Sequence, residues 1–87
     1  MPKQKYNKKA QLIKETFYHE ENKKISHIHE YNPKNRELIK YITYYPSGRI
    51  NYITEWDELG NELIQETYYN SDGSLKWREK YQLDEEK

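Results

Sequence analysis

The chain has 87 residues, of which 34% are charged, and its 15 basic and 15 acidic residues cancel to a net charge of zero. A chain of this length forms one small domain, and the charge balance removes the long-range attraction to nucleic acids or anionic membranes. Because the sequence contains no cysteine, disulfides and thiolate metal sites are excluded.

The amino-terminal stretch, residues 1–11, is polar and rich in lysine. Its Tyr6-Asn7 pair returns at Tyr31-Asn32, so we interpret this stretch as the remnant of a preceding repeat. No apolar segment follows it, and no apolar run in the chain is long enough to span a bilayer. No signal peptide is visible, so the chain is expected to be either an intracellular protein or a mature form whose signal was removed.

The first full repeat is expected at residues 12–37. Polar and apolar residues alternate from Leu12 to Tyr18 and from Ile25 to Tyr31, which is the period of a β-strand. The segment between these strands predicts a turn with Asn22 in the left-handed conformation. A second turn is expected at residues 32–35, where proline occupies the second position.

The same pattern of two strands and two turns occurs twice more, in repeats at residues 38–62 and 63–87. These repeats predict four further strands, at Leu38–Tyr44, Ile50–Trp56, Leu63–Tyr69 and Leu75–Tyr81. A glycine follows three of the strand patterns, and we expect positive φ or tight hairpin closure at Gly48, Gly60 and Gly73.

The pattern as a whole predicts an all-β fold in one domain spanning residues 1–87. We expect an antiparallel meander of about six strands, built from β-hairpin repeats of about 25 residues. Helix is disfavoured because a turn signal arrives about every 12 residues and the strands are rich in Tyr, Ile, Thr and Trp. With no helix to cover it, the sheet is expected to be a single layer, to coil over itself, or to dimerise face to face.

Strict alternation along each strand also predicts which side chains share a face of the sheet. One face is expected to carry Leu12, Ile25, Leu38, Ile50, Leu63 and Leu75. The other face is expected to carry Ile13, Phe17, Ile28, Ile39, Ile53, Ile64 and Tyr68.

The stretch YNPKNRELIKYITYYPSGRINYITEWDELGNELIQETYYNSDGSLKW resembles the tandem tyrosine-rich repeats of phytoplasma proteins, a family of unknown function. The resemblance covers Leu12 to Tyr81, and a looser one, through residues 56–61, is to the YD-type repeats of secreted β-shells. Asn22 and Asn35 stand where the pattern has glycine. The resemblance supplies no catalytic residue, and it implies a bacterium inside plant and insect cells that exports some such proteins to act on host proteins.

Three histidines raise the question of a metal site. His27 and His29 form a His-x-His pair on one strand face, and His19 lies in the preceding turn, so the imidazoles could share a metal ion. The corresponding positions of the later repeats hold Tyr52 with Thr54 and Trp77 with Glu79, which indicates a variable surface row. We therefore expect no metal and no cofactor.

The acidic residues do not suggest catalysis. A glycosidase needs two carboxylates held at a fixed separation in a cleft. Most of the candidates lie in turns or opposite lysines, as solvated charges: Glu15, Glu20, Glu21, Glu30, Glu55 and Glu66. The chain also lacks a nucleophile elbow and a glycine-rich phosphate loop, so the sequence predicts no enzyme.

Aromatic and basic residues alternate in the second and third repeats, at Tyr41, Tyr52, Lys40, Arg49, Lys76, Trp77 and Arg78. This pattern fits stacking on nucleic-acid bases, but it also fits a protein interface, where Tyr, Trp and Arg carry much of the binding energy. Neutral net charge argues against nucleic acid. The sequence therefore predicts a non-enzymatic protein-interaction module, with a nucleic-acid-binding sheet as the alternative.

The binding surface is expected on a face of the sheet near Tyr41, Tyr52, Trp56 and Trp77. Charged residues on the first and last strands are expected to discourage pairing at the edges of the sheet. The identity of the partner and the question of a homo-oligomer stay open.

Overall fold

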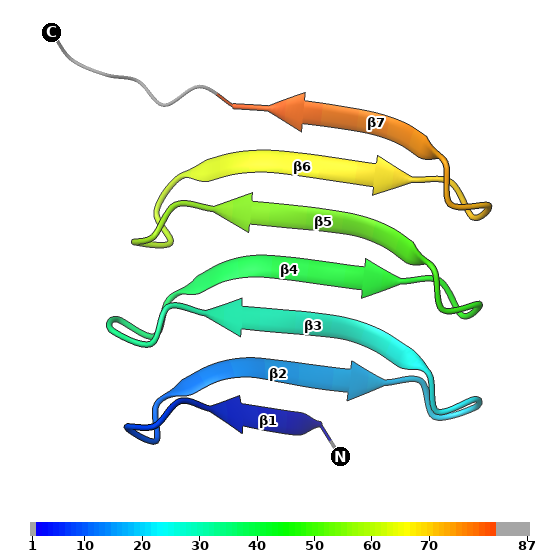
Figure 1. Ribbon diagram of the computed structural model, residues 1–87. Helices are drawn as coiled ribbons and strands as arrows, with labels where there is room; N and C mark the ends of the chain where they lie inside the picture. Colours follow the sequence, from blue (N-terminus) through cyan, green and yellow to red (C-terminus); the bar gives the residue numbers. More distant parts are fainter. Residues whose placement is uncertain (1, 82–87) are drawn as a thin grey trace, which may run out of the picture.

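The computed structural model describes residues 2–81, and its regular structure in that range is entirely β-strand (Figure 1). The strands are β1 (Lys3–Tyr6), β2 (Leu12–Tyr18), β3 (Ile25–Tyr31), β4 (Leu38–Tyr44), β5 (Ile50–Trp56), β6 (Leu63–Tyr69) and β7 (Leu75–Lys80). Strands β2 to β6 have the bounds predicted from alternation, and β7 ends one residue early. The short strand β1 was not predicted, because its sequence KQKY has almost no apolar content.

All seven strands form one antiparallel sheet in which each strand pairs with its neighbours in the sequence (Figure 1). The predicted meander is therefore confirmed. The principal extents are 50 × 37 × 15 Å, and each strand contacts only its neighbours in the sheet, so no strand of residues 2–81 packs over another as a second layer. Over this range the sheet is therefore a single layer and does not coil over itself. Strands β1 and β7 form its two edges.

Every strand pair contains one register shift near an end of the pair. In each pair the second residue of the later strand is the extra one: Ile13, Ser26, Ile39, Asn51, Ile64 and Lys76. An extra residue of this kind is a β-bulge, and it reverses the alternation of side chains for the rest of the strand.

These bulges make part of the predicted face assignment wrong. Phe17 lies opposite His27, and Ile28 is the next residue along β3, so Phe17 and Ile28 point to different faces. Tyr68 lies opposite Tyr52 in the same way, whereas the next residue of β5 points to the other face. Simple alternation had placed the aromatic and aliphatic residues of the strand centres together, and the structure separates them.

Most of the buried residues form a thin row across the middle of the sheet. Thr16, Ile28, Ile42, Ile53 and Thr67 lie opposite one another in successive strands, and all of them except the half-buried Ile53 are buried. The neighbouring Thr54 is also buried, but it points to the other face. Ile28 and Ile42 keep 5% and 8% of their surface exposed. Among the described residues, no large side chain is less than 2% exposed. The fold therefore depends on neighbouring strands covering each other rather than on a deep core.

The turns confirm the expectation for glycine. Gly48, Gly60 and Gly73 have φ values of 103°, 74° and 97°. The expectation for Asn22 is wrong, because Lys23 is the residue with positive φ, at 65°. Asn22 instead uses its Oδ1 to accept a 2.9 Å hydrogen bond from the backbone N–H of Lys24.

Alternate turns lie on the same side of the sheet (Figure 1). Side chains of one turn donate hydrogen bonds to the next turn on that side, one repeat later. Such turns are two strands apart, or about 10 Å, which a side chain can bridge. Each bond runs from a side chain in the earlier turn to a backbone carbonyl in the later one: Asn22 to Pro46, Lys24 to Ser47, Asn32 and Asn35 to Glu58, Tyr45 to Tyr69, and Arg49 to Asp72. We call these bonds the turn ladder.

Candidate functional site

One face of the sheet carries a continuous row of rings, which we call the aromatic face: Phe17, His27, His29, Tyr41, Tyr52, Tyr68 and Trp77. Phe17 stacks on His27 with ring centroids 4.3 Å apart. Tyr52 lies 6.0 Å from Tyr41 and 5.4 Å from Tyr68. Aromatic pairs across strands stabilise a sheet by roughly 0.2–1 kcal/mol each, so this row also supports the fold.

The β1 side of the aromatic face is held by a hydrogen-bonded carboxylate. Glu15 accepts a 2.7 Å bond from the Tyr31 hydroxyl and a 2.8 Å bond from the side-chain amide of Gln4. The bond from Gln4, and then that from Tyr31, lowers the pKa of Glu15. Burial, together with Glu15, raises the pKa of Tyr31 to about 12. Glu15 is therefore charged and Tyr31 neutral at physiological pH, and Glu15 with its partners Gln4 and Tyr31 links β1, β2 and β3.

The two histidines of the aromatic face are packed against other rings. Their ring centroids are 5.3 Å apart. Burial lowers the pKa of His27, and the charges of His29 and His19 lower it further. No group of three His, Cys, Asp or Glu residues within residues 2–81 is arranged to hold a metal ion. The expectation that His27 and His29 bind no metal stays a prediction, which zinc binding in equilibrium dialysis would contradict.

The structure brings three of the four predicted binding residues onto one face. Tyr41, Tyr52 and Trp77 belong to the aromatic face. Trp56 lies at the last position of β5, next to the bulge of β6, and lines a separate hollow together with Ile39, Lys40, Glu55 and Ile64. Trp56 is therefore set apart from the row that contains the other three.

The alternation of aromatic and basic residues in the sequence does not persist in space. Lys40 pairs with Glu55 at 4.0 Å on the opposite face, and Arg49 bonds the carbonyl of Asp72 in a turn. Arg78 donates to the hydroxyl of Thr67, which is also on the opposite face. Carboxylates, rather than most of these cations, accompany the rings.

Sequence reasoning missed the part that β2, β3 and β6 play in this surface. Phe17, His27 and Tyr68 belong to it through register. A signal was present, because His27, Tyr52 and Trp77 are each about 25 residues apart and occupy the same place in successive repeats.

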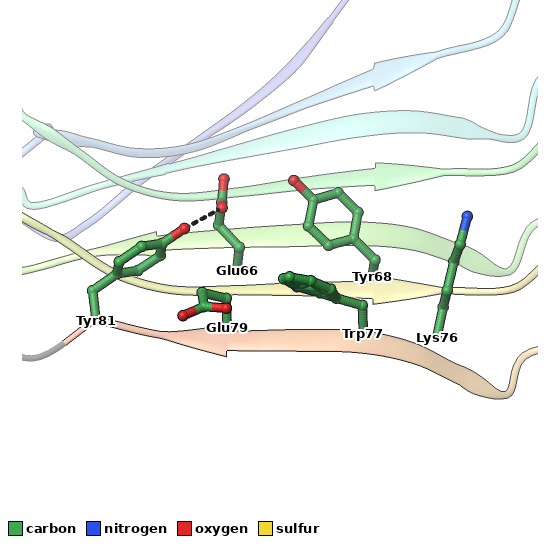
Figure 2. A pocket seen from close by; sticks show the side chains of 6 residues that line it. All are labelled: Glu66, Tyr68, Lys76, Trp77, Glu79 and Tyr81. Carbon is green, nitrogen blue, oxygen red and sulfur yellow. Dashed lines mark hydrogen bonds between the residues drawn. The ribbon is translucent and has the colours of Figure 1, made fainter.

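The aromatic face ends in a hollow of about 390 Å³ beside the last strand, shown in Figure 2 and lined by Glu66, Tyr68, Lys76, Trp77, Glu79 and Tyr81. Trp77 is 47% exposed there, and the Tyr81 hydroxyl donates a 2.8 Å bond to Glu66. The bulge at Lys76 explains why Lys76 and Trp77 project to the same side.

Comparison with known proteins gives one match. A family model described as "Protein of unknown function (DUF2963)" matches residues 3–43 and again residues 44–87. No curated protein and no solved structure matches the chain. The described residues contain no helix with the length and apolar character needed to cross a membrane.

Proposed function

We propose that the chain, which belongs to the family described as "Protein of unknown function (DUF2963)", is a non-enzymatic module that binds other proteins. The observation that carries the proposal is the aromatic face, which no second layer covers within residues 2–81. Tyrosine and tryptophan are the side chains that most often anchor protein interfaces. A rigid sheet also presents them at low conformational cost.

The arrangement of the carboxylates supports a role without catalysis. Glu15 and Glu66 accept hydrogen bonds from tyrosine hydroxyls, and Glu55 accepts a 2.9 Å bond from the side-chain amide of Gln65. Each is occupied with holding neighbouring strands together. A general acid or base would instead need to be free to reach a substrate.

Protein is favoured over nucleic acid as the partner. The aromatic face carries Glu15, Glu66 and Glu79, whose charges would repel phosphates. Most strand lysines and Arg78 lie on the other face. The finer proposal, that the protein is exported by a bacterium and acts on host proteins, is supported by the resemblance to phytoplasma repeats alone.

The test is a capture experiment followed by affinity measurements. Wild-type protein and a Tyr52→Ala variant are incubated with bacterial and host lysates, with and without nuclease treatment, and the captured proteins are compared by mass spectrometry. Lys14→Ala, on the opposite face, is the control.

We expect to capture proteins that bind the wild type and the control equally well. Their binding free energy for the Tyr52→Ala variant should be weaker by more than about 1 kcal/mol, the typical loss for an interface anchor. Circular dichroism checks that the variant is folded. Capture that disappears after nuclease treatment would favour the nucleic-acid alternative, and capture that ignores Tyr52 would contradict a role for the aromatic face.

A further inference from the structure

The last strand differs from the internal strands that occupy the same place in the repeat. We propose that the edge of β7 that pairs with no other strand of residues 2–81 is a docking site for an extended acidic segment of a partner protein, which adds to the sheet as an antiparallel strand. Edge strands present unpaired N–H and C=O groups that can accept such a segment. This inference goes beyond the proposed function, because it uses another surface and another mode of binding.

The first support is a reversal of charge on β7. Along one row of the sheet the charges alternate from β2 to β5, where Lys14, Glu30, Lys40 and Glu55 lie opposite one another in turn. In β6 the row continues with the uncharged Gln65. Strands β3 and β5 carry the glutamates, but the equivalent residue of β7 is Lys80. Opposite charges across strands stabilise pairing, so a strand added next to Lys80 should carry a carboxylate where β2 and β4 carry lysine.

The adjacent position reinforces this preference. Arg78 occupies the place that Ile28 and Ile53 hold in β3 and β5. On this face β7 therefore presents two cations, Arg78 and Lys80, to whatever lies beyond its free edge. A partner with two carboxylates spaced two residues apart would face both of them.

The second support is the apolar surface left open on the other face of β7. Trp77 is 47% exposed, whereas the equivalent residue of β5, Tyr52, is half-buried. In the interior, Tyr68 of the next strand lies opposite Tyr52 and closes this surface. Within residues 2–81 no strand lies beyond Trp77, which lines the hollow in Figure 2, so an added strand with an aromatic residue opposite Trp77 would cover this ring.

Pairing with a second copy of the chain is disfavoured at this edge. Pairing β7 with β7 would bring Arg78 and Lys80 against the same residues of the other copy. Pairing it with the other edge of the sheet would bring them against Lys3 and Lys5 of β1. Like charges opposite each other destabilise strand pairing.

The turn ladder indicates that the occupant is a single strand rather than a further hairpin repeat. In the second repeat, Tyr45 and Arg49 extend the ladder to the following turn. The equivalent residues of the third repeat, Asn70 and Ser74, bond each other at 2.9 Å instead. A docked segment from another chain needs no turn at this position, so the loss of these forward donors does not hinder it.

The probe is a blocked synthetic peptide, Leu-Gln-Glu-Thr-Glu-Tyr-Tyr, patterned on strand β6. In the register that β6 adopts with β5, its two glutamates face Lys80 and Arg78 and its first tyrosine faces Trp77. The control peptide has lysine in place of both glutamates. A third peptide is N-methylated at the residues whose N–H groups would pair with β7.

Calorimetric titration of the full chain should show that the glutamate peptide binds about tenfold more tightly than the lysine peptide, and that N-methylation abolishes binding. The Arg78→Glu/Lys80→Glu variant should reverse the preference. The matched variant Lys3→Glu/Lys5→Glu, which changes the charge equally at the other edge, should leave it unchanged. Bound peptide should also slow hydrogen exchange in β7.

Equal affinity for the two charged peptides, or no saturable binding, would overturn the proposal and leave the cations of β7 as a block against pairing. Self-association through β7, seen by sedimentation of the wild type, would also overturn it. If the β7 variant does not fold, the comparison of the peptides on wild-type protein decides alone. Tyr52→Ala should leave peptide affinity intact, so this test is separate from that of the aromatic face.

Discussion

At the scale of single residues, Gly60 shows how a turn in one repeat is fitted to a turn in another. Its φ of 74° is close to the values of 62–65° that Ala10, Lys23 and Arg36 adopt, so the backbone alone does not demand glycine. A Cβ atom at position 60 would, however, lie 2.6 Å from the Cβ of Glu37. The requirement for glycine therefore comes mainly from the neighbouring repeat.

A double-mutant cycle tests this explanation. Gly60→Ala should destabilise the wild type by over about 1 kcal/mol more than it destabilises a Glu37→Gly background, because overpacking of this kind typically costs 1–3 kcal/mol. Urea denaturation of the four proteins measures the difference. Equal costs in both backgrounds would assign the effect to backbone strain alone.

The half-buried imidazole of His27 predicts how stability depends on pH. Its pKa in the folded protein is lowered from 6.5, mainly by burial, so the unfolded chain binds more protons between the two values. Stability should therefore fall as the pH drops from about 7 to about 5. Thermal unfolding at both pH values measures this loss.

The substitution His27→Tyr supplies the control for this prediction. Tyr52 occupies the equivalent place in the second repeat, so the ring is kept while the titrating group is removed. We expect the variant to lose less stability than the wild type over this pH range. An unchanged pH dependence would assign the effect to other groups.

At the scale of the elements, each turn serves the hairpin that it closes and also the next turn on the same side. Asn32 shows both roles, since its Oδ1 accepts from the N–H of Lys34 and its Nδ2 donates 2.8 Å to the carbonyl of Glu58. Strand pairing links each strand to its immediate neighbours only. The turn ladder adds a link between successive repeats.

Tyr45 and Tyr44 offer a matched test of the ladder. The Tyr45 hydroxyl donates a 2.7 Å bond to the carbonyl of Tyr69, so Tyr45→Phe should cost about 1 kcal/mol. In a domain of this size that corresponds to a fall in Tm of roughly 4–8 °C. Tyr44→Phe removes a hydroxyl that makes no side-chain hydrogen bond within residues 2–81, and should change Tm less. Equal shifts would show that the ladder bond contributes nothing.

At the scale of the whole molecule, a single-layer sheet has stability that varies from its centre to its edges. Every internal strand is covered by two neighbours, but β1 has one and all four of its residues are exposed. In such repeat structures stability is approximately a sum of terms between nearest neighbours. The edges should therefore open before the centre.

Native-state hydrogen exchange measures this gradient. Hydrogen-bonded amides of β3 to β5 should exchange at least about tenfold more slowly than those of β1. Uniform protection across all seven strands would instead mean that the sheet opens only as one unit.

The sequence by itself determined the fold class and most strand bounds. Alternation from Leu38 to Tyr44 and from Ile50 to Trp56, with Gly48 between them, specifies a hairpin from local information alone. The repetition of that hairpin pattern specifies the meander, because a short turn can join only strands that run antiparallel to each other. The sequence also indicated aromatic side chains of the candidate surface, because Tyr52 and Trp77 occupy the same position in successive repeats.

Only the tertiary structure decided which residues share a face. Ile64 and Lys76 are bulges, and the sequence carries no local mark of a bulge, because the extra residue is defined by the partner strand. One extra residue reverses the faces, which is why Phe17 joined the aromatic row instead of the aliphatic one. The turn ladder and the exposed edge at β7 likewise depend on segments a repeat apart, and their contacts exist only after the strands have paired.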